Sequence, residues 1–599
     1  MWEAAAVAYE QRVQELLDMY GAPDACAAEL LCDRHPADAV AFTMVRPDLS
    51  HKDLRYGELK HRSERFAAAL ADLGVKPGDA VATLMGKSEE LIVALLGIWR
   101  RGAVDVPLFT AFGADAIAFR LEASNCRLVV ADADQRAKLV PGGDVPSDAS
   151  PLVIVARGEA LGYDLSFADL LGEEAADDGG ADFPGEDLPS RDVSGGDVPG
   201  SHVRGGDVDD GGDAGSSGPG DSVGRRSGPP PVAVGGDGLL VKLFTSGTTG
   251  SPKGVPIPLR SVASFVGYQE FGLDVRPDDV FWNAADPGWA YGLYFAILAP
   301  LASGIRSIML QGGFSAERTW QVFEKFKVSN FAAAPTVYRS LAAGSAAGST
   351  YVLRRASSAG EPLTPDVIGW SRQALGIPVR DHYGQTEHGM VVCNAWREDL
   401  QAPLREGSMG RALPGWTAAV LDALEDTPVP AGTVGRVAIE VAKSPLMWFS
   451  GYAGDPVKTA ERFSPDGRWY LTGDAGRRDD DGFFYFSARD DDVIIMAGYR
   501  IGPFDVESVL ANHPDVVESA VIGAPDQIRG EVLEAYVVLR QGVGGSAELV
   551  AQLQDLVKRG FAAHAYPRRV HFVAELPKTP SGKIQRFILR QQRAAGPGE

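Results

Sequence analysis

Short apolar runs that alternate with longer amphipathic segments constrain the fold of this chain most strongly. Helix-like patterns over 59–73 and 89–101 alternate with strand-like runs over 80–84 and 103–107. This alternation is typical of a parallel sheet covered by helices. It continues, with one interruption, to about Arg489. The sequence therefore predicts an α/β protein with a large N-terminal domain, residues 1–490, of parallel-type sheets flanked by helices.

The last part of the chain, residues 491–599, has its own set of elements. We expect strands at 493–496, 516–522, 532–539 and 569–572, and helices at 503–512 and 547–559. A set of this size is enough for a separate small α+β domain. A chain of 599 residues also exceeds what one hydrophobic core usually organises.

Residues 171–238 interrupt the alternation with a Gly-, Asp-, Ser- and Pro-rich segment. The segment carries 15 acidic residues and 4 arginines, so its net charge of −11 is about half of the −23 of the chain. Such a composition cannot bury enough apolar surface to offset the entropy of ordering. We therefore predict a disordered insertion within the N-terminal domain, either an expanded surface loop or a tether.

Charge and cysteine usage exclude several classes of protein. Nucleic-acid binding is disfavoured because the net charge of −23 leaves few clustered cations for phosphates. The four cysteines show no CxxC spacing and are too few for a disulfide framework. The N-terminus reads as an amphipathic helix, and no run is apolar and long enough to span a membrane. We expect a cytoplasmic protein with no membrane span.

A phosphate-binding loop is predicted over 243–254, LFTSGTTGSPKG. Glycines let backbone N–H groups approach phosphate oxygens, hydroxyls add donors, and the lysine supplies positive charge. A Walker loop is excluded because Lys253 is preceded by Pro252 and followed by Gly254. The candidate phosphate-binding residues are Thr245, Ser246, Gly247, Thr248, Thr249, Gly250 and Lys253.

This loop resembles the phosphate loop of the adenylate-forming superfamily, which includes acyl-CoA synthetases. Further segments match the family in its order: SSAGEPL at 357–363, DHYGQTEHG at 381–389, YLTGDAG at 470–476, ARDDDVIIMAGYRIG at 488–502 and TPSGKIQR at 579–586. The acetyl- and medium-chain acyl-CoA synthetases are the most similar group. The resemblance covers nearly the whole chain outside the insertion, and implies that the C-terminal domain is mobile.

The resemblance implies a role for each matching residue. ATP would be contacted through Gly360, Glu361 and Pro362, through Asp381, His382, Tyr383, Gly384 and Gln385, and through Asp474, Arg489 and Arg500. The catalytic set would be Lys583, Thr386 and Glu387, with Glu387 as the Mg²⁺ ligand. Asp491 would be the interdomain hinge, and Gly498 would line the tunnel for coenzyme A. For Arg500, an exposed arginine without a ligand is the alternative.

The chemistry explains these residue types. A carboxylic acid attacks the α-phosphate of ATP to form an acyl adenylate, and the thiol of coenzyme A then displaces AMP. Because an anion approaches an anion in the first step, neutralising charge is the main catalytic task. Lys583 and Mg²⁺ would supply it.

The sequence constrains the identity of the acid substrate less than it constrains the ATP-binding and catalytic residues. The segment WNAADPGWAYG at 282–292 resembles the acyl pocket of the related synthetases, with Trp289 and Tyr291 as candidate walls or, alternatively, as core aromatics. Acetyl-CoA synthetases carry a tryptophan that closes the pocket just before the Gln-Thr-Glu of the magnesium segment. Gly384 stands there instead. We therefore expect a medium-chain or aromatic acid, larger than acetate, and a shift towards acetate in Gly384→Trp.

Two alternatives stay open from the sequence. The acyl group could pass to the thiol of a separate carrier protein in place of coenzyme A. The chain could also be a catalytically silent nucleotide-binding protein. Lys583 stands in a Gly-Lys context that related synthetases present to lysine acetyltransferases, and acetylation there would remove the catalytic charge.

Overall fold

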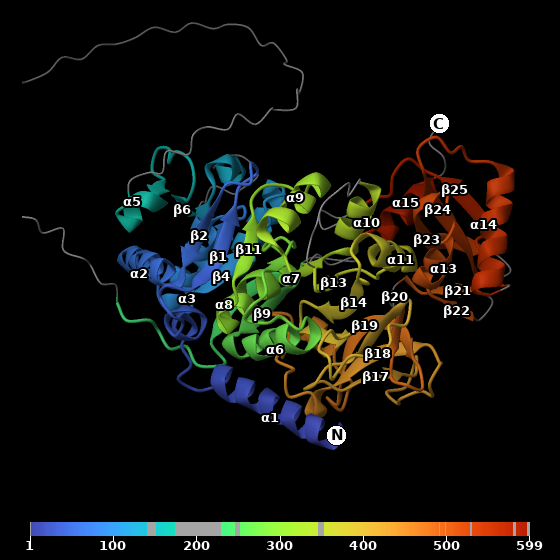
Figure 1. Ribbon diagram of the computed structural model, residues 1–599, viewed down its shortest axis with the longest axis horizontal. Coiled ribbons are helices and arrows are strands. Elements are labelled where there is room, and N and C mark those ends of the chain that lie inside the picture. Colours follow the sequence, from blue (N-terminus) through green and yellow to red (C-terminus); the bar gives the residue numbers. More distant parts are fainter. Residues whose placement is uncertain are drawn as a thin grey trace, which may run out of the picture.

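The computed structural model describes residues 2–139, 151–173, 229–245, 252–344, 353–489, 492–496, 499–526, 530–562, 564–578 and 583–595. Figure 1 shows a large body of sheets and helices, with a smaller unit of strands and helices at one end of the long axis. The predicted α/β class is therefore confirmed. The predicted insertion lies almost wholly outside the described residues, and so does the predicted boundary at 490/491, which stays a prediction.

Within the described residues, thirteen strands form the largest sheet, in the order β17-β18-β19-β20-β16-β15-β14-β13-β12-β10-β11-β1-β2. The strands of its parallel half and its edge are β1 (Val40–Val45), β2 (His51–Arg55), β10 (Phe281–Asn283), β11 (Ser307–Leu310), β12 (Asn330–Ala333), β13 (Arg355–Ala359) and β14 (Arg380–Gln385). The antiparallel half contains β15 (Gly389–Cys393), β16 (Ser408–Ala412), β17 (Ala418–Leu421), β18 (Gly435–Glu440), β19 (Trp469–Arg478) and β20 (Phe484–Arg489).

A second sheet of seven strands in the described chain has the order β7-β6-β5-β3-β4-β8-β9. Its strands are β3 (Ala80–Leu84), β4 (Val104–Pro107), β5 (Leu128–Ala131), β6 (Leu152–Val155), β7 (Leu165–Ser166), β8 (Leu239–Phe244) and β9 (Gly254–Pro258). The strands from β7 to β8 are parallel, and only the β8–β9 pair is antiparallel. The strand-like runs predicted at 80–84 and 103–107 are thus neighbours in this sheet.

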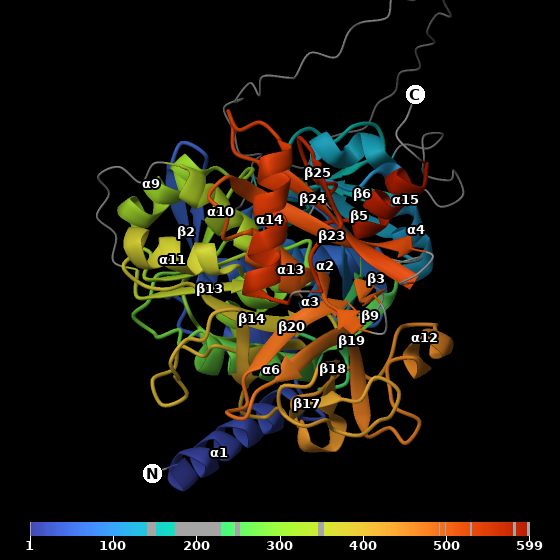
Figure 2. The same cartoon turned by 90° about the vertical axis from the view of Figure 1, so that its right-hand side faces the viewer.

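The smaller unit is built on a third sheet, with the order β22-β21-β24-β23 and β25 beside β24. Its strands are β21 (Ile494–Met496), β22 (Tyr499–Ile501), β23 (Val516–Asp526), β24 (Gly530–Leu539) and β25 (Arg569–Phe572). The predicted strands are confirmed, and the sequence analysis missed β22 and the last helix, α15 (Arg586–Ala595). Figure 2 shows α14 in front of this sheet when the small unit faces the viewer.

The helices cover the sheets. Those of the large body are α1 (Trp2–Tyr20), α2 (Tyr56–Asp72), α3 (Glu89–Arg100), α4 (Ala114–Ser124), α5 (Phe167–Leu171), α6 (Val262–Gly267), α7 (Ala290–Gly292), α8 (Ala299–Ser303), α9 (Ala316–Phe326), α10 (Pro335–Ala343), α11 (Pro365–Ala374) and α12 (Pro456–Ala460). Those of the small unit are α13 (Pro503–Leu510), α14 (Ala547–Gly560) and α15. No described helix is long and apolar enough to cross a membrane.

The parallel strands place the candidate site. β12, β13 and β14 run parallel, so their carboxyl ends meet at one edge of the large sheet. Ligands bind at such edges in open α/β sheets. The predicted turn Gly360–Pro362 directly follows β13, and Thr386 and Glu387 directly follow β14. Segments far apart in the sequence therefore converge there.

Gly384 lies in the hairpin of β14 and β15, where the register shifts between Tyr383 and Gly384. A Cβ built on Gly384 would lie 2.0 Å from the carbonyl oxygen of Gly389 and 2.7 Å from Cα of Met390. The close approach of two backbones thus requires a residue without a side chain. A tryptophan at 384 can therefore close the acyl pocket only if the two strands first move apart, and the expected shift towards acetate in Gly384→Trp stays a prediction.

We predict that Gly384→Ala lowers the free energy of unfolding by about 1–3 kcal/mol, because the added methyl group overpacks against backbone that cannot move freely. Thermal unfolding monitored by circular dichroism measures the effect. Gly369→Ala is the matched control, since Gly369 lies in α11 with nothing within 4 Å of an added Cβ. It should stabilise the protein by about 0.5–1 kcal/mol. Equal midpoints for both variants would contradict the packing argument.

Candidate active site

Asp474 on β19 is the most heavily bonded acidic side chain of the candidate site. It is 3% exposed. Its Oδ2 accepts hydrogen bonds from the Tyr383 hydroxyl at 2.5 Å and from Gln385 Nε2 at 2.7 Å, and its Oδ1 accepts one from Arg489 Nη1 at 2.8 Å. Three predicted ATP-binding residues from β14 and β20 are thereby fixed on one carboxylate.

These bonds limit how Asp474 can bind a ribose. A carboxylate offers roughly four lone-pair sites, and three are used by its protein partners. The predicted contact of Asp474 with the ribose hydroxyls would therefore share the carboxylate with these protein donors. The arrangement orients the carboxylate before any ligand binds.

Glu387, the predicted Mg²⁺ ligand, is 7% exposed in the turn between β14 and β15. Its Oε1 accepts a hydrogen bond from the hydroxyl of Tyr452 at 2.7 Å. The Tyr452 oxygen in turn accepts one from Arg462 Nε at 3.2 Å. Two residues that the sequence analysis did not single out therefore orient the glutamate. Beside it, the carbonyl of Thr386 accepts a hydrogen bond from Tyr294 at 2.9 Å.

Lys253, at the end of the predicted phosphate loop, reaches the same cluster. Its Nζ lies 5.0 Å from the centre of the Tyr452 ring, which is a cation–π distance. Loss of water lowers the pKa of Lys253, and the nearby Arg462 lowers it further, while Glu387 acts in the opposite direction. Tyr452 thus contacts both the lysine of the loop and the glutamate of the magnesium segment.

Lys583 belongs to the small C-terminal unit, yet its electrostatic partners lie in the large body. Its side chain keeps exposed surface, but the surrounding protein removes enough water to lower its pKa. Arg489 also lowers it, whereas Glu361, Asp474 and Glu387 raise it. The lysine therefore lies at the edge where the other predicted site residues meet.

The turn after β13 is held by charged side chains on both sides. Glu361 accepts a hydrogen bond from Arg339 Nη2 of α10 at 3.1 Å. Burial raises the pKa of Glu361, and Arg339 and Lys583 oppose that shift. Asp381 Oδ2 accepts a hydrogen bond from the backbone N–H of Leu363 at 3.4 Å, and burial raises its pKa to about 8. Asp381 therefore holds the end of the turn after β13 through its hydrogen bond to the backbone of Leu363.

His382, a predicted ATP contact, has both of its ring nitrogens bonded within the protein. Desolvation lowers its pKa to about 3, so the ring is neutral. Its Nε2 lies 3.3 Å from the carbonyl oxygen of Asn394, which must accept, and its Nδ1 therefore accepts from the hydroxyl of Tyr268 at 2.8 Å. Both ring nitrogens are engaged within the protein, so a contact of His382 with ATP would have to use its backbone or its ring face, and the predicted contact stays a prediction.

The same chain of hydrogen bonds ends at Tyr291. Because Tyr268 donates to His382, its oxygen accepts from the Tyr291 hydroxyl, 3.1 Å away. Tyr291 is thus oriented by a buried network. Trp289 packs against Phe109 and Phe112, with ring centres 5.1 and 5.9 Å apart. Both aromatic residues of the predicted acyl segment are half-buried.

Several predicted residues lie outside the described part of the chain. These are Ser246, Gly247, Thr248, Thr249 and Gly250 of the loop, Asp491 at the predicted hinge, and Gly498 of the predicted tunnel. For Arg500 the structure describes the backbone on β22 but not the side chain. Their roles stay predictions.

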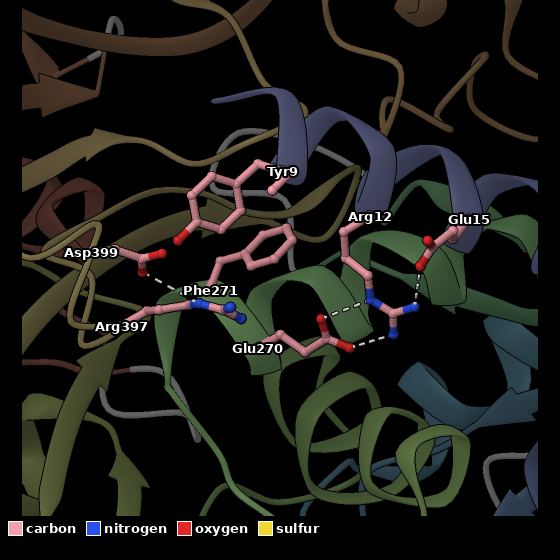
Figure 3. Close-up of a pocket in the computed structure, with 8 residues that line it drawn as sticks. Tyr9, Arg12, Glu15, Glu270, Phe271, Arg397 and Asp399 are labelled. Carbon is pink, nitrogen blue, oxygen red and sulfur yellow. Dashed lines mark hydrogen bonds and ion pairs between the residues drawn. The ribbon is translucent and has the colours of Figure 1, made fainter. Parts of the chain in front are cut away.

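A cavity of about 340 Å³ lies elsewhere, between α1 and the helical segment Tyr268–Gly272 (Figure 3). Its walls carry charges that are already paired: Arg12 with Glu270 at 2.7 Å, and Arg397 with Asp399 at 3.4 Å. No predicted site residue lines it. Its volume alone therefore does not make it the active site.

Comparison with known proteins identifies the family. A family model described as "AMP-binding enzyme" matches residues 29–452, and one described as "AMP-binding enzyme C-terminal domain" matches residues 505–583. An acetyl-coenzyme A synthetase of Bacillus subtilis is 32% identical over 579 residues, which cover 94% of this chain and 90% of the relative. A human mitochondrial acyl-coenzyme A synthetase is 38% identical over 363 residues, covering 59% and 60%.

Solved structures agree with the sequence relatives. The crystal structure of a Brucella canis acyl-CoA synthetase has a TM-score of 0.68 and 40% identity, covering 99% of this chain and 97% of that chain. ATP-bound MatB from Rhodopseudomonas palustris has a TM-score of 0.76 at 25% identity, covering 95% and 99%. The chain belongs to the AMP-binding enzyme family, the adenylate-forming superfamily, close to its acetyl- and medium-chain acyl-CoA synthetases.

Proposed function

We propose that the chain is an AMP-forming acyl-CoA synthetase that converts a medium-chain or aromatic acid, ATP and coenzyme A into acyl-CoA, AMP and diphosphate. The observation that carries the proposal is the set of bonded residues around Asp474 and Glu387, with which Lys583 interacts electrostatically. Relatives whose names specify coenzyme A support that thiol as the acceptor. A separate carrier protein remains the alternative acceptor.

Charge distribution supports the first half-reaction. A carboxylate oxygen bonds to the α-phosphorus as diphosphate leaves, so negative charges must be brought together. Lys583, Arg489, Lys253 and Arg462 lie around this edge of the sheet. Cations fixed in a poorly hydrated site stabilise such a transition state more than water does. In the second half-reaction the thiol attacks the carbonyl carbon and AMP leaves.

The residues present fit a magnesium ion of the kind that phosphate chemistry uses. Mg²⁺ is usually held by one or two carboxylates together with water and substrate phosphates. In the described chain no three His, Cys, Asp or Glu side chains are grouped to hold a metal, whereas Glu387 offers a single oriented carboxylate. The ion would screen the phosphates there. A site in which protein side chains alone coordinate the metal would need several such side chains grouped together.

We expect diphosphate release with ATP, Mg²⁺ and hexanoate, octanoate or benzoate, at a kcat/KM about tenfold or more above that for acetate, because each buried methylene group adds binding free energy. A coupled diphosphate assay measures the first half-reaction. Thioester formation with coenzyme A, compared with candidate carrier proteins, identifies the acceptor. If no acid of the panel supports diphosphate release, the result would favour a non-catalytic nucleotide-binding protein.

Lys583→Ala should abolish adenylate formation but leave thioester formation from supplied acyl adenylate largely intact, because the charge serves only the first step. Single-turnover assays of the two half-reactions measure the difference. Lys578→Ala is the matched control, since Lys578 pairs with Glu518 at 2.7 Å. It should affect neither step. Equal loss of both half-reactions in Lys583→Ala would contradict the assigned role.

Tyr452→Phe should raise the Mg²⁺ concentration needed for half-maximal adenylation by about tenfold, since a hydrogen bond to a charged group contributes about 1.5–3 kcal/mol. The ring beside Lys253 stays in place, so the variant loses only the two hydrogen bonds of the hydroxyl, the one donated to Glu387 and the one accepted from Arg462. Diphosphate release titrated with Mg²⁺ measures the change. Tyr485→Phe, which removes a hydroxyl bonded to Asp479 at 3.1 Å, is the control. An unchanged magnesium requirement would exclude Tyr452 as a positioning residue.

A further inference from the structure

Arg462, two residues after α12, carries a guanidinium group that two hydrogen bonds hold in place. Its Nε donates to the hydroxyl of Tyr452 and its Nη1 donates to the backbone carbonyl of Thr472, both at 3.2 Å. In the described part of the chain, Nη2 has no hydrogen-bond partner, yet it is not one of the buried atoms that lack a partner. The half-buried arginine therefore keeps accessible surface at Nη2, with two N–H groups that can bind a ligand.

Tyr452 brings Arg462 together with the predicted phosphate and magnesium segments. The hydroxyl that accepts from Arg462 donates to Glu387, the predicted Mg²⁺ ligand, at 2.7 Å. Nζ of Lys253, the lysine of the predicted phosphate loop, lies 5.0 Å from the centre of the same ring. Arg462, Lys253 and Glu387 therefore surround one tyrosine side chain.

The two cations of this cluster differ from other cations nearby. Lys458 pairs with Glu461 at 3.1 Å, and Arg468 pairs with Glu440 at 3.0 Å. Within the described residues, neither Arg462 nor Lys253 forms an ion pair, and the charge of Arg462 lowers the pKa of Lys253. Glu387 opposes that effect with only one negative charge. An anion bound beside Tyr452 would therefore offset the repulsion between the two cations.

The backbone of β19 places the guanidinium group relative to the predicted ribose contact. Gly473 has a φ of +72°, and a Cβ there would collide with Nη1 of Arg462. The guanidinium group thus packs on the backbone directly before Asp474, the predicted ribose contact, while its Nε reaches the tyrosine that orients Glu387. The phosphates of ATP extend from the ribose to the metal ion that they bind. Arg462 therefore lies along the path that the phosphates would take.

We propose that Arg462 binds the diphosphate part of ATP, and that its Nη2 donates hydrogen bonds to oxygens of the leaving diphosphate. The inference rests on the proposed function and deepens it by adding a substrate-binding residue. A guanidinium group offers phosphate oxygens a planar pair of donors, whereas a lysine offers a point charge. When the bond between the α-phosphorus and its bridging oxygen breaks, the electron pair stays on the diphosphate. Arg462 stabilises that negative charge.

The charges of the cluster favour the diphosphate over the other anions of the reaction. Arg462 and Lys253 supply two positive charges beside the predicted Mg²⁺ ligand. Diphosphate carries several negative charges, whereas the carboxylate of the acid and the phosphate of the acyl adenylate carry one each. The attraction therefore is strongest for the diphosphate.

The test compares the binding of ATP and AMP to the full-length protein by isothermal titration calorimetry, without any acid and at saturating Mg²⁺. Arg462→Gln should weaken ATP binding by about tenfold to a hundredfold, the loss expected for hydrogen bonds to a charged group. AMP binding should not change, because AMP lacks the diphosphate. An unchanged affinity for AMP also shows that the variant is folded.

Two further variants serve as controls. Arg462→Lys should bind ATP with an intermediate affinity, because lysine retains the charge but not the planar pair of donors. Arg468→Gln is the matched control, since Arg468 is 49% exposed and pairs with Glu440. It should bind both nucleotides as the wild type does.

The two half-reactions provide a second readout. In the reverse of the first, an oxygen of diphosphate attacks the α-phosphorus of supplied acyl adenylate, so that ATP forms and the carboxylate leaves. Arg462→Gln should raise the KM for diphosphate in this assay by about tenfold or more. Thioester formation from the same adenylate involves no diphosphate and should keep its rate.

The outcomes separate the inference from the function on which it rests. Equal losses of ATP and AMP affinity in Arg462→Gln, or no loss of either, would overturn the assignment. If the variant only needed more Mg²⁺, as expected for Tyr452→Phe, Arg462 would merely position Tyr452 and the assignment would also fail. If the wild type binds ATP but releases diphosphate with no acid, the proposed function fails, while the comparison of ATP with AMP still decides the role of Arg462.

Discussion

The buried carboxylate of Asp474 is the interaction on which the rest of the site depends. A buried anion is tolerated only when donors surround it, and here the donors come from two other strands. Tyr383 and Gln385 come from β14, and Arg489 comes from the end of β20. The carboxylate thereby ties the parallel half of the large sheet to its antiparallel half. Because Glu387 follows Gln385 by two residues, its position is set by the same ties.

The cations of the site are held apart from one another by these acids. Arg489 bonds to Asp474, and Arg462 is held on Tyr452 beside Glu387. Lys583 meets Arg489 as a like charge, which lowers the pKa of the lysine. Phosphate groups bound between Lys583 and Arg489 would offset the repulsion between these two cations. When the phosphates leave the site, the repulsion would return. The predicted mobility of the lysine-bearing unit has a physical rationale in this balance, and it stays a prediction.

The sequence predicted those parts of the fold and site that depend on local patterns. The predicted strands and helices of the small unit lie at or near their predicted positions, since apolar periodicity is read within a few residues, whereas β22 and α15 were missed. Tyr452 was missed because its partner Glu387 is 65 positions away and no local pattern links them. The bond between Tyr268 and His382 spans 114 positions and was missed for the same reason. Gly384 was interpreted as a missing side chain, although its cause is the backbone of Gly389, which no motif reveals.

The acyl segment shows most clearly what a buried polar group implies. Two polar arrangements lie on either side of it: the neutral network from Tyr291 through Tyr268 to His382, and the pair of Asp105 with Thr83. In the first arrangement the hydrogen-bonding capacity of the histidine is met within the protein, so it needs no ligand and serves to orient a wall. In the second, one carboxyl oxygen has no hydrogen-bond partner within the part of the chain that the structure describes. Only the second arrangement therefore carries the cost of an unsatisfied buried oxygen, which apolar side chains in its place would avoid.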